Sequence, residues 1–228
     1  MFFKREDFGF NKEEMEILLK LNTPKKIQDF LNNEIEMNFE ENGETCMSPR
    51  RVLRERKGHC MEGAMLAAAI LRIHGEKPLV LDLEATKDDE DHVITVFKKN
   101  GKWGAIGKTN HYVLRYREPV YRDMRELVMT FFHEYFLNKN GKKTLRRYSN
   151  PIDLSRFDKY NWMTSEEDVW FVPQYLADCK HNEILTKKQI RELRLVDNIE
   201  IEAGKIVDKK DPKYDYKSLN EKQEPLNH

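Results

Sequence analysis

The chain has 228 residues, of which 39% are hydrophobic and 35% charged, which suits one globular domain with a strongly charged surface. Lys plus Arg and Asp plus Glu are equal at 40 each, so no net field attracts nucleic acid or an anionic membrane. The chain begins Met-Phe-Phe-Lys-Arg-Glu-Asp, so charged residues take the place of the apolar core that a signal peptide would have. No apolar stretch is long enough to span a bilayer. We therefore expect a soluble, cytoplasmic protein.

The first third of the chain predicts three short helices and a fourth that is buried. Each short helix has a polar capping residue at its start, and in two of them Pro follows the cap. The predicted short helices span 11–21, 24–35 and 49–54. Residues 60–74 are small and apolar on nearly every side, which predicts a helix inside the protein that ends at Gly75.

Strands follow this buried helix. The apolar patterns predict strands over 78–83, 92–97 and 103–108, with an acidic turn over 87–91. Asn100-Gly101 favours a two-residue hairpin turn, in which Lys99 pairs with Lys102 and Ile94 faces Gly107. Helices followed by an antiparallel sheet predict the α+β class.

The second half of the chain has weaker patterns. We expect an extended segment over 112–120, an amphipathic helix over 121–137, a capped helix start at 164–168 and a short helix near 186–195. The last residues have little to bury and predict a polar tail. The predicted organisation is one domain over 1–204, with a core at about 23–111, an extension over 112–204 and a tail over 205–228.

Cys60 has the position that a nucleophile needs. A cysteine attacks as the thiolate, and the positive end of a helix dipole lowers the pKa of a thiol placed there. Gly58 allows a sharp turn before the helix, and main-chain N–H groups at the helix start can stabilise an oxyanion. The other two cysteines, Cys46 and Cys179, form no CxxC pair with it, which argues against disulfides and structural zinc.

His92 is the candidate base for Cys60, because it begins a strand expected beside the buried helix. His59 is adjacent in sequence, but neighbouring side chains at a turn usually point apart. The alternative is that Cys60 is a small core residue and His92 fills space on a strand. The order of glycine, cysteine, apolar helix, strand and histidine-led strand favours the catalytic interpretation.

Between Thr23 and Asn110 the chain resembles the transglutaminase-like superfamily, which has a papain-like fold. That family has a Gly-x-Cys entering a helix, a Leu-Arg-x-x-Gly exit, then a His-led and a Trp-led strand. The matching segments here are Gly58-His59-Cys60, Leu71-Arg72-Ile73-His74-Gly75, His92-Val93-Ile94-Thr95-Val96 and Trp103. The resemblance implies that Cys60 is the nucleophile and His92 its base. The whole chain also resembles a group of uncharacterised prokaryotic proteins with this core.

The chain departs from the family at the residue that orients the histidine. The family usually has an Asp four positions after the Trp, and here that position is Gly107. Asn110 lies just beyond, and papain-type enzymes use Asn as the third member of the triad, so Asn110 is the candidate substitute. Weaker options are Asp82, Asp91 and His111.

Other motifs point to no second chemistry. His133-Glu134 lacks the partner histidine of a metal motif, and no glycine loop is present to hold phosphate, so we expect neither metal nor cofactor. Two arginine-rich clusters favour solvated faces, with an anion or nucleic-acid site as the alternative. These clusters are Arg50, Arg51, Arg54, Arg56 and Lys57, and Arg115, Arg117, Arg122 and Arg125.

These observations lead to a ranked set of functions. The first is hydrolysis or transfer of a peptide or protein amide through a thioester on Cys60, with the substrate unspecified. The alternative is a catalytically inactive binding module that has kept the fold, because Gly107 leaves the Asp position empty. A nucleic-acid-associated factor ranks last because the net charge is zero.

Overall fold

The computed structural model describes residues 8–212, and its first four elements are helices. The side chains of Asn11, Thr23 and Ser48 each accept a main-chain N–H in the first turn of the helix that follows, which confirms the predicted caps. Pro occupies the first position of the second and third helices. The four helices are α1 (Lys12–Lys20), α2 (Pro24–Asn33), α3 (Pro49–Glu55) and α4 (Cys60–Ile73).

Helix α4 lies inside the molecule, as its composition predicts. All of its residues from Met61 to Leu71 are buried, including Glu62. Gly63 lets the side chain of Lys108 cross the helix, because a Cβ atom at position 63 would overlap the Lys108 stem. The Lys108 ammonium then donates to Leu31 O at 2.9 Å and to Ile35 O at the end of α2.

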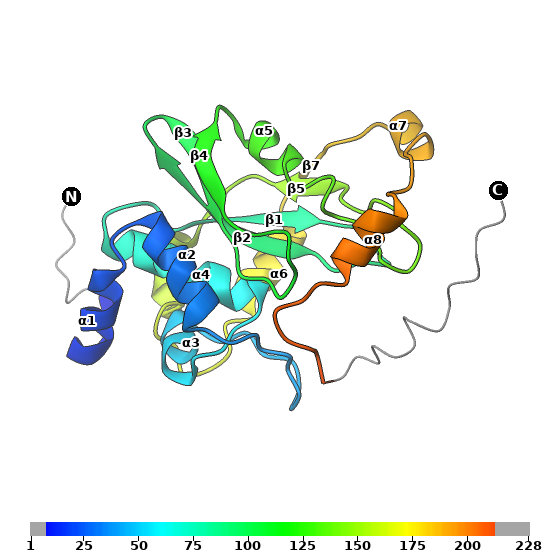
Figure 1. Ribbon diagram of the computed structural model, residues 1–228. Helices are drawn as coiled ribbons and strands as arrows, with labels where there is room; N and C mark the ends of the chain where they lie inside the picture. The colour runs from blue at the N-terminus through cyan, green and yellow to red at the C-terminus, as the bar shows by residue number, and fades with distance from the viewer. Residues whose placement is uncertain (1–7, 213–228) are drawn as a thin grey trace.

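The strands form one antiparallel sheet beside α4 (Figure 1). Its strand order is β4-β3-β2-β1-β5-β7, and β6 pairs with β1. The α+β class is therefore confirmed. The strands are β1 (Leu79–Glu84), β2 (His92–Lys99), β3 (Lys102–Ile106), β4 (Arg117–Tyr121), β5 (Arg147–Ser149), β6 (Ile152–Asp153) and β7 (His181–Glu183).

The hairpin between β2 and β3 has the predicted register. Lys99 pairs with Lys102 and Thr95 with Ile106, and continuing the register by one residue places Ile94 opposite Gly107. Asn100 and Gly101 both have positive φ, at 50° and 76°, which is the geometry of the expected turn.

Alternate residues of the central strands pack against different layers. Val93 and Phe97 contact the helical layer that contains α4. Ile94 and Val96 face the opposite layer, which contains α5 (Met124–Met129) and the turns after it. The sheet is thus buried on both faces, and α4 is held firmly enough to position a side chain at its end.

Two predicted helices are wrong. The helix expected over 121–137 is limited to α5, because from Thr130 onward the main-chain N–H groups bond carbonyls three residues back and the chain continues in turns. Phe131, Phe132 and Tyr135 are buried from those turns, so the aromatic residues mark burial rather than a helix. No helix starts at 164–168, where Ser165 caps only a local turn through Glu167 N.

The remaining elements complete the layers around the sheet. They are η2 (Leu154–Tyr160), α6 (Phe171–Asp178), α7 (Lys187–Arg191) and α8 (Asn198–Gly204). Helix α7 agrees with the helix expected near 186–195, whereas α8 was not expected. Of the predicted tail, residues 205–212 are described and 213–228 lie outside the described residues. Within residues 8–212 no helix has the length and apolarity to cross a membrane.

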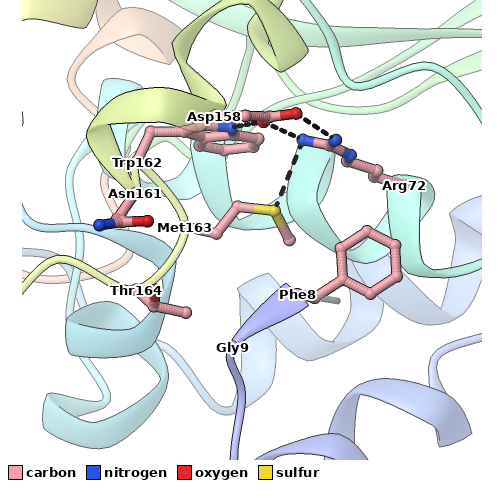
Figure 2. Close-up of a pocket in the computed structure, with 8 residues that line it drawn as sticks. All are labelled: Phe8, Gly9, Arg72, Asp158, Asn161, Trp162, Met163 and Thr164. Atoms are coloured by element: carbon pink, nitrogen blue, oxygen red, sulfur yellow. Dashed lines mark hydrogen bonds and ion pairs between the residues drawn. The ribbon is translucent and has the colours of Figure 1, made fainter. Parts of the chain in front are cut away.

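A cavity of about 320 Å³ lies where η2 and the turn after it meet the N-terminal segment (Figure 2). Arg72 forms an ion pair with Asp158 there, and Trp162 donates its indole N–H to the same carboxylate at 3.1 Å. None of Cys60, His59 or His92 lines this cavity, so it is separate from the predicted site. Its lining residues are Phe8, Gly9, Arg72, Asp158, Asn161, Trp162, Met163 and Thr164.

Candidate functional site

Cys60 is the first residue of α4, and the turn before it is held by main-chain contacts. Gly58 N–H donates to Glu36 O at 2.9 Å, and Glu36 forms a parallel bridge with Lys57. The left-handed residue of this turn is Arg56, with φ of 55°, and Gly58 does not have a positive φ. Gly58 packs closely, because a Cβ there would lie 3.3 Å from Val52 Cγ1.

His59 caps α4 and lies against the thiol, contrary to the expectation that it points away. Its Nε2 lies 3.1 Å from Thr45 O, and its Nδ1 is 3.3 Å from Met61 N. The Glu62 and Glu40 carboxylates lie 3.6 and 3.7 Å from Nε2. Because one nitrogen contacts a carbonyl and carboxylates, the surroundings favour the charged imidazolium form.

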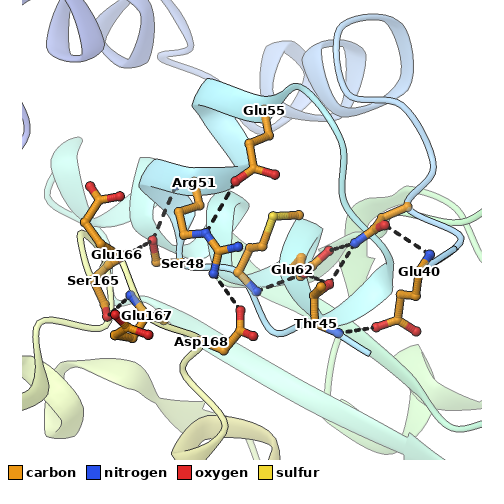
Figure 3. A network of polar contacts seen from close by, with 12 residues as sticks. Glu40, Thr45, Ser48, Arg51, Glu55, Glu62, Ser165, Glu166, Glu167 and Asp168 are labelled. Atoms are coloured by element: carbon orange, nitrogen blue, oxygen red, sulfur yellow. Dashed lines mark hydrogen bonds and ion pairs between the residues drawn. The ribbon is translucent and has the colours of Figure 1, made fainter. Parts of the chain in front are cut away.

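Glu62 is the buried acid that supports this arrangement. Its carboxylate accepts from Thr45 Oγ1 at 2.8 Å, Met47 N at 2.9 Å, Asn38 Nδ2 at 3.1 Å and His59 N at 3.0 Å. Figure 3 shows Glu62 and Glu40 on either side of Thr45. A fully buried carboxylate with this many donors fixes the loop before α3 onto the start of α4.

The charges of Cys60 and His59 stabilise each other. Burial opposes the thiolate, but side-chain hydrogen bonds to His59 and His92 outweigh it and lower the pKa of Cys60 to about 5. Burial likewise opposes a charged His59, yet the bond to Cys60 and the Glu62 carboxylate raise the pKa of His59 to about 9. When protonated, the His59 ring donates to the Cys60 sulfur, and when neutral its Nδ1 can accept from Met61 N–H. At neutral pH we assign thiolate and imidazolium.

The other two thiols of the chain have the opposite environment. Burial raises the pKa of Cys46, and the nearby Glu62 carboxylate adds to the increase. Burial also raises the pKa of Cys179, whose thiol donates to Leu176 O at 3.1 Å. Cys60 is thus the one thiol of the three whose pKa is lowered.

His92 is the first residue of β2, and it meets Cys60 where both elements begin. Its side chain is buried, and Nε2 has no hydrogen-bond partner among the described residues. A Cβ built on Gly107 would lie 3.5 Å from this Nε2 and 2.8 Å from Leu114 O. Gly107, which stands where the transglutaminase-like pattern has Asp, therefore faces the outer side of the His92 ring.

Asn110 does not support His92. Its amide donates to Lys209 O at 2.8 Å and its carbonyl accepts from Lys209 N at 3.0 Å, so both ends bind the C-terminal segment. The amide that does reach Gly107 is Gln28, which exchanges two hydrogen bonds with the Gly107 main chain. The structure thus brings Cys60 and His92 together but leaves Asn110 on another partner.

None of the weaker options for the third residue bonds His92 Nε2. Asp82 Oδ2 lies 2.9 Å from His181 Nε2, and burial raises the pKa of Asp82 to about 6 despite this contact. Asp91 accepts from Ala85 N at 2.7 Å. The main chain of His111 bridges Val207, and burial, together with the nearby charge of His92, lowers the pKa of the His111 ring.

Carboxylates compensate the first arginine cluster. Arg50 pairs with Glu14 at 3.0 Å and Arg51 with Asp168 at 2.6 Å. Arg54 pairs with Glu166 in the same way, and Arg56 stacks on an aromatic ring. Arg51 and Arg54 therefore fasten helix α3 to the loop at 164–168.

Within residues 8–212 no group of three or more metal-ligating side chains is arranged to hold an ion.

Comparisons with known proteins identify no family for the chain. A scan against protein-family models found no match, and a search of curated proteins found no significantly similar protein. The function therefore has to be argued from the geometry around Cys60.

Proposed function

We propose that the chain is a transglutaminase-like cysteine enzyme that hydrolyses or transfers the acyl group of an amide through a thioester on Cys60. The observation that carries the proposal is the thiol at the start of a buried helix, hydrogen-bonded to two histidines, with its pKa lowered to about 5. Lowered thiol pKa values mark nucleophilic rather than structural cysteines.

Formation of the thioester assigns a role to each group. The Cys60 thiolate adds to the carbonyl carbon of the amide, and His92 enters this step protonated from solvent. The His59 imidazolium, held by Glu62, offsets the thiolate charge beforehand. The main-chain N–H of Cys60 has no acceptor within the helix and is placed to bind the oxyanion. As the C–N bond breaks, His92 donates its proton to the leaving amine and becomes the neutral base for the second half of the reaction.

The second half of the reaction releases the enzyme. A water molecule gives hydrolysis and an amine gives transfer, and in either case His92 takes the proton of the attacking group. The tetrahedral adduct then expels the Cys60 thiolate, and the acid or the new amide leaves.

A second candidate is a binding module that has lost catalysis, and one observation favours it. His92 Nε2 has no partner among the described residues, so an imidazolium there keeps one buried N–H unpaired. A module of this kind would keep a reactive thiol but would not resolve a thioester.

Reaction with p-nitrophenyl acetate separates the two candidates. We expect a burst of nitrophenolate, an acetyl group on Cys60 by intact and peptide mass spectrometry, and loss of that acetyl group within each turnover. Cys60→Ser removes the burst, and His92→Gln retains it but accumulates acetyl-enzyme. His74→Gln, at the far end of α4, is the matched control that leaves both steps unchanged.

Each result of this experiment decides between the candidates. A burst that survives in Cys60→Ser excludes Cys60 as the nucleophile. Wild-type protein that acetylates but stays acetylated for hours is the binding module. Turnover that is lost in His92→Gln supports the enzyme.

A further inference from the structure

The chain after α8 returns to the candidate site as an extended segment, which we call the C-terminal strap (residues 206–211). Ile206 O accepts from Tyr112 N at 3.2 Å, and Val207 forms an antiparallel bridge with His111. Asp208 N donates to Asn110 O at 2.8 Å, and Lys209 exchanges two hydrogen bonds with the Asn110 side chain. The strap is therefore bound as an added strand.

Two ion pairs fasten the strap. Asp208 pairs with Arg115, in the segment between β3 and β4, at 2.5 Å. Lys209 pairs with Glu36 at 2.7 Å, and the Glu36 main chain binds Lys57 and Gly58 just before Cys60. Figure 1 shows the orange-red strap running from α8 towards the blue loop between α2 and α3.

The charges at the end of the strap and at the thiol both reach the carboxyl group of Glu90. Burial raises the pKa of Glu90, and the negative charges of Cys60 and Asp211 add to the increase. Glu90 is two residues before His92, and its main-chain carbonyl accepts from Tyr135 at 2.8 Å. The strap thus ends where its charge reaches the acidic turn that leads into His92.

The strap is held by its main chain as well as by its side chains. Its hydrogen bonds to Asn110 and Tyr112 use the main-chain groups of the strap, which any extended polypeptide supplies. Ile206 is 59% exposed, and Asp208 and Lys209 are exposed as well, so the strap buries little apolar surface. Exposed ion pairs add little stability, so opening the strap is easy compared with unfolding the domain.

We propose that the strap occupies the place where an extended polypeptide substrate binds beside Cys60, and that it must leave before such a substrate enters. This inference rests on the proposed function and narrows its substrate class to a polypeptide held by main-chain hydrogen bonds along Asn110–Tyr112. Asn110 then has a role that differs from the predicted one: it positions the substrate main chain instead of the base.

The test releases the strap in the full-length chain. Lys209→Pro removes the N–H that binds Asn110 and the ion pair with Glu36, whereas the matched control Lys209→Ala removes only the ion pair. Cys60 is labelled with a small reagent, iodoacetamide, and with a bulky one, fluorescein maleimide. Hydrogen exchange at Tyr112 N–H reports whether the strap has left, and a synthetic peptide of residues 204–212 is added as a competitor.

We expect Lys209→Pro to speed bulky labelling by about tenfold, with a smaller change in Lys209→Ala and little change for iodoacetamide. The added peptide restores protection. Faster exchange at Tyr112 without faster bulky labelling, or unchanged exchange, overturns the inference. Failure of iodoacetamide to label Cys60 at all contradicts the proposed function instead, so the two failures are distinguishable.

Discussion

His59 and His92 contact the same thiol, yet their surroundings differ in almost every respect. His59 has a carbonyl 3.1 Å from Nε2 and two carboxylates within 3.7 Å. His92 is buried with Nε2 facing Gly107 and no hydrogen-bond partner among the described residues. A histidine with acceptors on its outer side, such as His59, holds a positive charge well.

In the proposed mechanism, two histidines share tasks that a single histidine usually performs. His59 would hold the charge that keeps Cys60 as a thiolate, and His92 would move protons during the reaction. Only His59 has a supporting acid, because the Glu62 carboxylate lies near it, whereas Gly107 faces His92. Substitutions at the two histidines are therefore expected to have different consequences.

Replacing His92 has the largest expected effect. His92→Gln slows hydrolysis of the acetyl-enzyme by about 10²–10⁴-fold, the usual contribution of a general base. The pH midpoint of Cys60 alkylation rises as well, because both histidines lower the pKa of the thiol. Stopped-flow release of nitrophenolate measures the first effect. Equal deacylation in both proteins would remove His92 from the mechanism.

Replacing His59 has a different signature. His59→Asn supplies a side chain that can cap the helix but removes the cation, so the midpoint of alkylation rises from about 5 by about 1–2 pH units. Thermal unfolding checks that the fold is retained, and His59→Ala is the control that removes both the cation and any side-chain cap. A midpoint that stays near 5 in His59→Asn assigns the charge to His92 alone.

Glu62→Gln tests the acid behind His59. The amide cannot accept from all the donors that the carboxylate binds, so we expect a loss of about 1–3 kcal/mol in the free energy of unfolding by urea. The pKa of His59 falls below about 9, as followed by NMR of its ring protons. Glu40→Gln is the control, with smaller changes in both quantities because Glu40 is only half-buried. Equal effects in the two variants would contradict the role of Glu62.

Gly107→Asp has the smallest expected effect on chemistry and tests the other side of the contrast. Any side chain at position 107 lies too close to Leu114 O, so Gly107→Asp and the control Gly107→Ala both lose about 1–3 kcal/mol of stability. Only the Asp variant places a carboxylate beside His92 Nε2, and we expect its deacylation to exceed that of Gly107→Ala by up to about tenfold. Identical rates would show that the outer side of His92 does not limit turnover.

Local signals in the sequence sufficed for the framework of the site. The capped starts at Asn11, Thr23 and Ser48, the buried helix from Cys60 and the Asn-Gly hairpin are all present as predicted. Each depends on residues a few positions apart, so the pattern contains the information.

The role of His59 was missed because it depends on a loop that no pattern connects to the helix. Thr45 and Glu40 reach His59 only through the fold. One local signal was present, since His59 and Glu62 have the cap-to-third-residue spacing of a capping box. A second signal is that Glu62 is an acid in an otherwise apolar helix, because buried acids need partners.

The C-terminal strap and the turns after α5 show two further limits. The strap has a polar composition typical of a free tail, but its main-chain hydrogen bonds to Asn110 can form with any residue type and so leave no signal in the composition. Aromatic spacing over 131–135 predicted a helix, yet Phe131 and Tyr135 are buried from consecutive turns. Burial alone therefore does not reveal the backbone that achieves it.

The pH dependence of Cys60 alkylation tests the central claim most directly. A thiol whose pKa is lowered stays ionised above that pKa, so the rate with iodoacetamide should rise through a midpoint near 5 and stay level across neutral pH. Mass spectrometry assigns the label to Cys60 rather than Cys46 or Cys179. A midpoint near the ~8.5 of a free thiol would contradict a charged nucleophile between two histidines.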